Sequence, residues 1–363
     1  MNRMQNQLNA LCDMTPDMIS GNYSPMRSIH IAALAVFGAT LLVGCGVDPG
    51  DENNVETPSR AITSPFDTSD APKASELPAL DGRAAAAREG VREMSLGVSA
   101  MSLASSWYSG SVAPGASQHW YWNNASLTGA FKVGLSPTGA STSNPCQFEV
   151  ASSWDVQQYG GEREFHFTIK NTGNITCGTN ILLGWQDRSS TWATGGIDVG
   201  ASKSWTWNNA TPLSASYVVG VSPTGATSSS PCQLEVTRSW YDQQPGGERE
   251  FKFTVTNVGA VACQGDVQLV TITNVNSSWW TPTMSPGASG TWVLNNADPL
   301  DRVYAPGLWP LGASGVTPCV LEVTRSYYQQ FINSDGTTER KFSLTVQNTG
   351  SLSCYGIVML NYI

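Results

Sequence analysis

The sequence predicts an all-β protein in which three tandem β-sandwich modules follow an N-terminal extension. Three observations lead to this prediction. A series of motifs recurs three times beyond residue 105, several segments alternate apolar and polar residues, and only 13% of the 363 residues are charged. Gly, Ser, Thr, Asn and Trp are abundant in this region, and it has no long leucine-rich helical segment. This combination is typical of short strands connected by turns.

The repeat consists of five motifs that keep the same order in each copy. A Gly-Ala-Ser turn comes first, followed by Trp and Asn-Asn-Ala, a Gly-x-x-Pro-x-Gly-Ala segment that we predict to be a turn, Pro-Cys, and Asn-x-Gly before a second Cys. The glycines that open the two turn motifs are Gly115, Gly200 and Gly287, and Gly134, Gly220 and Gly307. Such self-similarity marks a repeat architecture. It places the three modules at residues 106–188, 189–274 and 275–363.

Strand parity indicates which side chains face the core. In the first copy, Cys146 and Phe148 alternate with polar residues, and so do Phe165, Phe167 and Ile169. The other two copies repeat both patterns. Alternation with a period of two is typical of a strand with one buried face, so we expect both cysteines of each copy to point into the core.

The eight cysteines divide into two groups. Cys12 and Cys45 lie before the repeats, and the other six fall two to a copy. The simplest pairing is one disulfide inside each module: Cys146–Cys177, Cys232–Cys263 and Cys319–Cys354. Such bonds persist in oxidising compartments. No Cys-x-x-Cys is present and no His recurs between copies, so we predict neither a metal site nor a cofactor.

The segments FHFTIKNTGNITC and FKFTVTNVGAVAC, at 165–177 and 251–263, are similar to the strand-turn-strand of bacterial immunoglobulin-like and CARDB-like modules. The resemblance implies that each module is an immunoglobulin-like sandwich. It also implies a hairpin with positive φ at Asn-x-Gly. It brings no catalytic or ligand-binding residues with it.

Residues 26–45 read as an export signal. A basic Arg27 precedes a mainly apolar run from Ile29 to Val43, and Gly44 and Cys45 follow. The run is too short for a membrane-spanning helix, which needs roughly 20 residues, and the order of its parts is that of a signal peptide. The ending Leu-Val-Gly-Cys resembles the bacterial lipobox. The alternative interpretation is a short buried helix that ends in a chance cysteine.

The lipobox resemblance implies that Cys45 carries a diacylglycerol and becomes the first residue of the mature chain. Gly46 is not the Asp that is typical of inner-membrane retention, so the resemblance implies an outer-membrane or cell-surface location in a Gram-negative bacterium. Residues 26–44 are then the signal peptide, and residues 1–25 are an extension before a true start at Met26 or part of an unusually long leader. Residues 45–105 have the composition of a flexible tether.

Charge and residue types limit the possible partners and chemistry. The net charge is −9 and the 19 basic residues are scattered, which excludes nucleic acid as a partner. Membrane contact is expected only through acylated Cys45. We predict no enzyme, because no histidine recurs in a position to serve as a base. Glu162 and Glu164, repeated as Glu248 and Glu250, suit a solvated strand with cross-strand ion pairs better than an acid and base pair.

Aromatic and amide residues are the remaining candidates for ligand binding. All 13 tryptophans lie between residues 107 and 309, and most are expected in the core or in seams between copies. Aromatic faces can also stack on sugars, and Asn-Asn-Ala can form turns or contact sugars. The candidate ligand-binding residues are Trp122, Asn123, Asn124, Trp207, Asn208, Asn209, Asn295 and Asn296.

These observations predict a surface-anchored lipoprotein with disulfide-stapled modules for non-catalytic extracellular binding, adhesion or spacing. Its ligand would be an unidentified protein or glycan. The first alternative is a glycan-binding, lectin-like protein that uses repeated Trp residues, and the second is a purely structural envelope scaffold. A lectin should repeat exposed aromatic residues, whereas a scaffold should repeat only core and turn residues.

Overall fold

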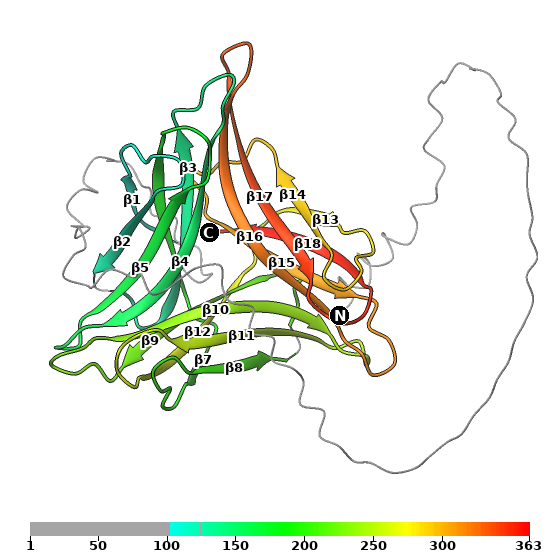
Figure 1. Ribbon diagram of the computed structural model, residues 1–363. Helices are drawn as coiled ribbons and strands as arrows, with labels where there is room; N and C mark the ends of the chain where they lie inside the picture. Colours follow the sequence, from blue (N-terminus) through cyan, green and yellow to red (C-terminus); the bar gives the residue numbers. More distant parts are fainter. Residues whose placement is uncertain (1–101, 124, 209) are drawn as a thin grey trace, which may run out of the picture. The chain divides into compact units, whose positions relative to one another are not determined.

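The computed structural model describes residues 102–123, 125–208 and 210–363, and these residues form strands and connections with no helix among them (Figure 1). The predicted all-β fold class is confirmed. None of the described residues belongs to a helix long and apolar enough to cross a membrane. Cys45, the signal peptide, the extension before Met26 and most of the tether lie outside the described residues. β1 begins at Ser102, inside the segment assigned to the tether.

Each repeat supplies six strands in the same order. The first repeat contains β1 (Ser102–Tyr108), β2 (Ser117–Asn123), β3 (Gly129–Thr138), β4 (Cys146–Gln157), β5 (Arg163–Asn171) and β6 (Gly178–Asp187). The second contains β7 (Ser190–Ala193), β8 (Ser202–Trp207), β9 (Ser216–Thr224), β10 (Cys232–Gln243), β11 (Arg249–Asn257) and β12 (Gln264–Ile272). The third contains β13 (Val275–Trp280), β14 (Ser289–Leu294), β15 (Tyr304–Leu311), β16 (Cys319–Ile332), β17 (Thr338–Asn348) and β18 (Tyr355–Tyr362).

The strands of each repeat fall into two sheets. In the first repeat, β1, β6 and β3 form one sheet, and β2, β5 and β4 belong to the other. The other two repeats pair their strands in the same order. An immunoglobulin sandwich pairs strands in the orders ABED and CFG. With β2 to β6 taken as strands B to F, the B-E-D and C-F pairings are present, and β1 lies beside β6 in the place of strand G. The repeats are therefore β-sandwiches, as predicted.

One disulfide joins the two sheets of each repeat, as predicted. The bonds are Cys146–Cys177, Cys232–Cys263 and Cys319–Cys354, with Cα–Cα distances of 6.1, 5.6 and 5.7 Å. All six cysteines are buried in the apolar core, together with the alternating residues Phe148, Phe165, Phe167 and Ile169 and their counterparts. The prediction that both cysteines of each copy point into the core is confirmed.

The repeats are joined to one another through their longest strands. The end of β4 pairs with the start of β10, the end of β10 with the start of β16, and the end of β16 with the start of β4. These three pairings close a ring, so that repeat 3 is bonded to repeat 1 as well as to repeat 2. The three repeats therefore share one nine-stranded sheet.

Two turn predictions need correction. The first glycines of the Gly-x-x-Pro-x-Gly-Ala motif lie inside strands and not in turns; they are Gly134, Gly220 and Gly307. A Cβ at Gly220 would lie 2.9 Å from Ala130 of repeat 1, so glycine permits the close approach of the neighbouring repeat. The second glycine of the same motif makes the turn, with φ near 100° at Gly139.

The Asn-x-Gly segment is the other correction, because β5 and β6 belong to different sheets and do not form a hairpin. Gly173 does not have positive φ. Instead, the buried Asn171 donates hydrogen bonds to the carbonyl oxygens of Val112 and Ile175, both 2.8 Å, and accepts one from the Gly173 amide at 2.9 Å. Asn257 and Asn348 repeat these contacts. The asparagine is retained for the bonds of its side chain.

Candidate ligand-binding site

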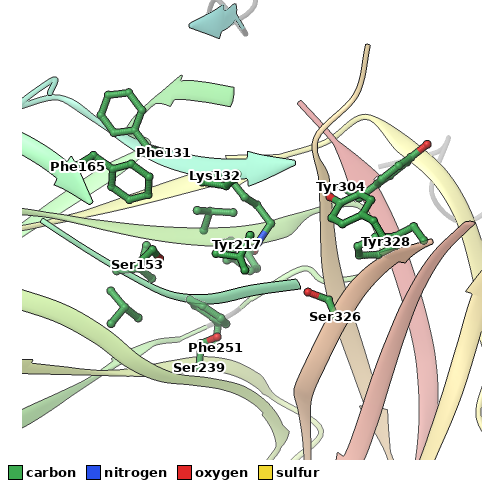
Figure 2. A pocket seen from close by; sticks show the side chains of 16 residues that line it. Phe131, Lys132, Ser153, Phe165, Tyr217, Ser239, Phe251, Tyr304, Ser326 and Tyr328 are labelled. Atoms are coloured by element: carbon green, nitrogen blue, oxygen red, sulfur yellow. The ribbon is translucent and has the colours of Figure 1, made fainter. Parts of the chain in front are cut away.

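A cavity of about 200 Å³ lies where the three repeats meet, and residues from all three line it (Figure 2). Six aromatic rings at equivalent positions of the repeats form part of its wall. The first set comes from β3, β9 and β15 and comprises Phe131, Tyr217 and Tyr304; the second comes from β5, β11 and β17 and comprises Phe165, Phe251 and Phe342. Rings of the two sets stack in pairs, with centroids 5.1 to 5.2 Å apart.

The opening of the cavity follows from the ring of long strands. Each of them is bonded to one neighbour at its start and to the other at its end, which leaves its middle free of inter-repeat pairing. The strand register also shifts there, after Val150, Val236 and Val323. Three serines, Ser153, Ser239 and Ser326, line the cavity from these middle sections, and Ser239 is exposed to solvent.

The cavity lining contains one charged residue. Lys132 extends from β3 into the lined space (Figure 2). Its counterparts in the other repeats are Val218 and Ala305, which occupy the same register position opposite β12 and β18. No carboxylate lines the cavity, and Lys132 has no hydrogen-bond or ion-pair partner among the described residues. Lys132 is partly buried, and this burial lowers its pKa because it disfavours the charged ammonium form.

An apolar cluster adjoins the cavity at Val218. Its members come from all three repeats and are Ala130, Leu182, Val270, Ile272, Val303, Ala305 and Ile363. Val218 packs against this cluster and also lines the cavity. The cavity therefore has an apolar side next to the cluster and a hydroxyl-lined opening at the long strands.

The ligand-binding candidates chosen from the sequence lie elsewhere. Trp122 and Trp207 are partly buried against the core, and each lies 5.7 Å from Trp107 or Trp192 between ring centroids. Asn123, Asn208, Asn295 and Asn296 are exposed at the ends of the second strands, whereas Asn124 and Asn209 lie outside the described residues. Asn296 has a φ of 51°, which is the left-handed turn conformation that asparagine tolerates.

A second polar centre lies on repeat 1, where β2 and β5 bring two of the three histidines together. His119 Nε2 lies 3.1 Å from His166 Nδ1, and His166 Nε2 lies 2.8 Å from Glu164 Oε2. Burial, with a smaller effect of His166, lowers the pKa of His119 to about 4, so His119 is neutral at pH 7. Although burial opposes its ionisation, hydrogen bonds with His166 and Gln158 hold the pKa of Glu164 below its usual value.

This centre resembles the base and orienting groups of a catalytic triad, but its described hydrogen bonds include no hydroxyl or thiol that could act as a nucleophile. Trp154 and Tyr121 stack on His166, with centroids 5.4 and 5.3 Å away. In repeat 2 the same position holds Lys252, paired with Asp242 at 2.6 Å and Glu250 at 2.9 Å. The centre is a local polar cluster of repeat 1 and not a repeated site.

Glu164 and Glu250 therefore pair with the residue two positions further along their own strand. The sequence interpretation expected cross-strand pairs instead. The arginines between the glutamates bond to backbone oxygens, Arg163 to Gly161 and Arg249 to Gly247, both at 3.1 Å. Within the described residues, no group of three or more His, Cys, Asp or Glu side chains could hold a metal ion.

The cavity was missed in the sequence because it depends on contacts between repeats. Its one signal is a break in the repeat, since lysine stands at a position where the other copies have Val218 and Ala305. No protein family model, no curated protein and no solved structure matches the chain. Its function must therefore be argued from its own residues.

Proposed function

We propose that the chain is an exported, lipid-anchored protein that presents one non-catalytic binding head, formed jointly by its three repeats, at the cell surface. The observation that carries this proposal is the convergence of all three repeats on a single cavity. The candidate ligand-binding residues chosen from the sequence are spread over all three modules. A shared cavity instead favours one site for the whole chain.

The disulfides support export. Each repeat holds one buried disulfide that joins its two sheets. Such bonds persist outside the reducing cytoplasm, and closing a loop of this size stabilises the folded state by roughly 3 to 4 kcal/mol in the chain-entropy model. The apolar run that ends at Cys45 supports attachment through lipid, and two or more acyl chains hold a protein at a bilayer where one does not.

A glycan-binding role through repeated tryptophans has weaker support. Strongly exposed aromatic residues occur at equivalent positions in repeats 1 and 3, as Tyr108 and Trp280, whose exposures are 57% and 59%. Repeat 2 has Ala193 there. The exposed aromatic position is therefore not repeated in every copy, as a repeated lectin site would require. A glycan array with the full chain tests this alternative, and specific glycan binding that is lost in Trp280→Ala would favour it.

Labelling with a palmitate analogue in a Gram-negative host tests the proposed anchor. We expect label on the full chain and on Cys12→Ser, and no label on Cys45→Ser, which should also leave the membrane fraction. Cys12→Ser is the matched control because it removes the other cysteine outside the repeats. Label that persists in Cys45→Ser, or a wild-type chain that fractionates without membrane, would contradict the proposal.

A further inference from the structure

We propose that the cavity between the repeats binds a small organic carboxylate, with Lys132 as the cation that pairs with the carboxylate group. This deepens the proposed function, on which it rests, by naming the class of ligand. The described lining of the cavity carries a positive charge without a counter-ion. Lys132 lines the cavity without a partner, and no Asp or Glu side chain is among the described residues that line it. Lys132 is only partly exposed, so water screens its charge incompletely, and a bound carboxylate would supply the missing partner.

The wall of the cavity combines polar and apolar groups. Polar groups make up the larger part of its accessible lining, and aromatic rings from all three repeats contribute to the apolar part, on which the body of a ligand can pack. Ser153, Ser239 and Ser326 add three hydroxyl groups at the opening, and none of them has a hydrogen-bond partner among the described residues. Hydroxyl groups can donate to a second polar group of the ligand.

The size of the cavity suits a small organic molecule. The cavity volume of about 200 Å³ is somewhat larger than the roughly 150 Å³ of an engineered apolar cavity that binds benzene. A ring or short chain with one carboxylate fits this space, and benzoate is a suitable probe. An inorganic anion would leave most of the aromatic wall without contact, so the wall favours an organic anion over phosphate or sulfate.

Lys132 has no lysine counterpart in repeats 2 and 3. A residue required only for the fold should have similar counterparts in all three copies, as the wall residues Phe131, Tyr217 and Tyr304 have. Lys132 instead replaces the apolar Val218 and Ala305. Lys132→Val copies the residue of repeat 2 and should therefore fold, which makes it a clean test of the ammonium group.

The experiment is titration calorimetry of the full chain with benzoate, benzamide and inorganic phosphate. We expect benzoate to bind, benzamide to bind at least about tenfold more weakly, and phosphate neither to bind nor to displace benzoate, because a charge-assisted hydrogen bond is about twice as strong as a neutral one. Lys132→Val should weaken benzoate binding at least about tenfold and bring it to the level of benzamide. Lys170→Thr, which removes a lysine outside the cavity, is the matched control and should bind as the wild type does.

Benzoate affinity should also fall as the pH rises through the lowered pKa of Lys132, because only the ammonium form attracts the carboxylate. The other titratable side chains that line the cavity are Tyr217, Tyr304 and Tyr328. Burial raises the pKa of both Tyr304 and Tyr328, which keeps these two uncharged over the same range. Lys132→Val should remove this part of the pH dependence.

Four results would overturn the proposal: no benzoate binding at millimolar concentration, equal affinities for benzoate and benzamide, unchanged benzoate binding in Lys132→Val, or tighter binding of phosphate than of benzoate. Amide shifts on benzoate addition should be centred on Ser153, Ser239 and Ser326, and shifts elsewhere would equally contradict the site. None of these readouts depends on Cys45. Failure of the carboxylate site is therefore distinguishable from failure of the anchor, which the palmitate label reports.

Discussion

The junction between repeats 1 and 2 differs in charge from the junctions between repeats 2 and 3 and between repeats 3 and 1. All three use the same backbone pairing, in which the end of one long strand pairs with the start of the next. All three also place a glutamine at the end of the long strand, where it accepts a hydrogen bond from the Gly-Ala turn of the next repeat. These glutamines are Gln157, Gln243 and Gln330.

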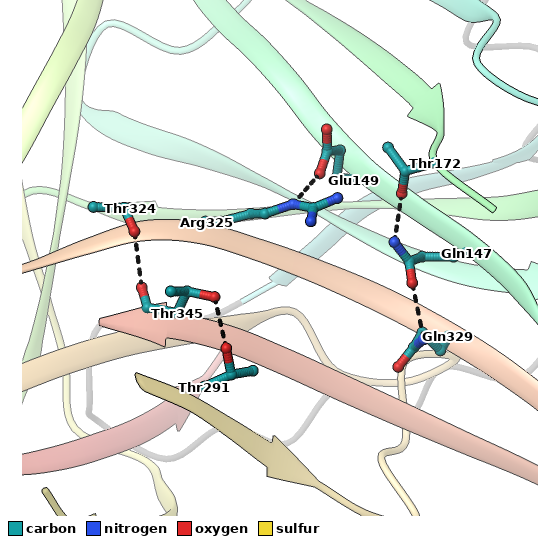
Figure 3. Close-up of polar contacts among 8 residues, drawn as sticks. All are labelled: Gln147, Glu149, Thr172, Thr291, Thr324, Arg325, Gln329 and Thr345. Carbon is teal, nitrogen blue, oxygen red and sulfur yellow. Dashed lines mark hydrogen bonds and ion pairs between the residues drawn. The ribbon is translucent and has the colours of Figure 1, made fainter. Parts of the chain in front are cut away.

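Two of the junctions add an ion pair. Arg325 of repeat 3 lies 2.7 Å from Glu149 of repeat 1 (Figure 3), and Arg238 of repeat 2 lies 2.7 Å from Glu322 of repeat 3. The residue at the same register position of β4 is Ser152. Glu235 of repeat 2 is the counterpart of Glu149 and Glu322 and faces this serine position. It has no ion pair among the described residues, and burial raises the pKa of Glu235 to about 7.

A second substitution makes the same junction acidic. Asp155 takes the place that Tyr241 and Tyr328 hold in the other repeats, and it accepts a hydrogen bond from the Val221 amide of repeat 2 at 3.1 Å. Burial raises its pKa to about 7, although the hydrogen bond opposes this shift. The comparison teaches that strand pairing and apolar packing close the ring, since one junction forms without the arginine that the other two contain.

The largest expected effect on stability comes from adding a side chain at Gly220, where the backbones of two repeats approach each other closely. Gly220→Ala would place a Cβ 2.9 Å from the Cα and Cβ atoms of Ala130, so one of the two strands must move. Overpacking of this kind costs about 1 to 3 kcal/mol, and we expect the free energy of unfolding to fall by about 2 kcal/mol. Gly246→Ala is the control, because nothing lies within 4 Å of its Cβ position. Urea unfolding measures both, and equal stabilities would contradict the close approach.

The pH dependence of stability should distinguish the acidic junction from the other two. A carboxyl group whose pKa is raised in the folded state keeps its proton there, so its contribution to stability is complete below about pH 4 to 4.5 and is lost as the pH rises through about 7. Each pKa unit corresponds to about 1.4 kcal/mol, and we expect a loss of at least about 1 kcal/mol between pH 5 and pH 8 from this junction.

Glu235→Gln should reduce that loss, and Glu322→Gln should not reduce it, because Glu322 is already paired with Arg238. Urea unfolding at pH 5 and pH 8 gives the comparison. If Glu235→Gln left the wild-type difference between the two pH values unchanged, Glu235 would not titrate in this range and the contrast between the junctions would be wrong.

Removal of an existing pair should have a smaller effect. Arg325→Ala leaves the mostly buried Glu149 carboxylate without its partner, whereas nearly half of the arginine side chain is exposed. We expect a loss of about 1 kcal/mol at pH 7. The loss should shrink at high salt concentration, because dissolved ions screen a partly exposed ion pair. A loss that is independent of salt concentration would assign the effect to packing on Tyr327, over whose ring Arg325 lies at 4.9 Å.

The smallest expected effect is a gain in stability. Ser152→Arg would supply the arginine that the other two junctions have at this register position. We expect about 0.5 kcal/mol of stabilisation at pH 8, and a Glu235 pKa below its wild-type value of about 7. Ser202→Arg, on an exposed strand away from the junctions, is the control. An unchanged Glu235 titration by carbon NMR would show that the two positions are not equivalent.

Much of the fold of each repeat could be predicted from local pattern. Alternation identified the buried faces that hold Phe165, Phe167 and Ile169, and cysteine count gave the three disulfides, because both signals depend on residues inside one copy. Strand order could not be predicted from alternation, since a period of two fixes the face of a strand and not its neighbours. The Asn171 contacts were missed for a related reason, because an Asn-x-Gly sequence suits both a hairpin turn and a buried side-chain bond.

The candidate site could not be predicted in the same way. The ring and its cavity arise from pairing between copies, and each copy carries the same motifs whether the repeats are separate or joined. Gly220 is the clearest instance, because a glycine that recurs at this place of the motif suggests a turn, whereas the structure places it beside Ala130 of the neighbouring repeat. Lys132 differs from its counterparts Val218 and Ala305 in the aligned copies, but the sequence does not show that this position lines a cavity.

The pairing of β16 with β4 is the most direct test of the account, since it joins repeat 3 to repeat 1 and no connecting peptide requires it. Backbone nuclear Overhauser effects in the full chain would report it. We expect cross-strand contacts between Phe148 and Tyr328 and between Gln147 and Gln329. Contacts of β4 with β5 alone, and none with β16, would mean that the repeats are separate modules and that the shared cavity does not exist.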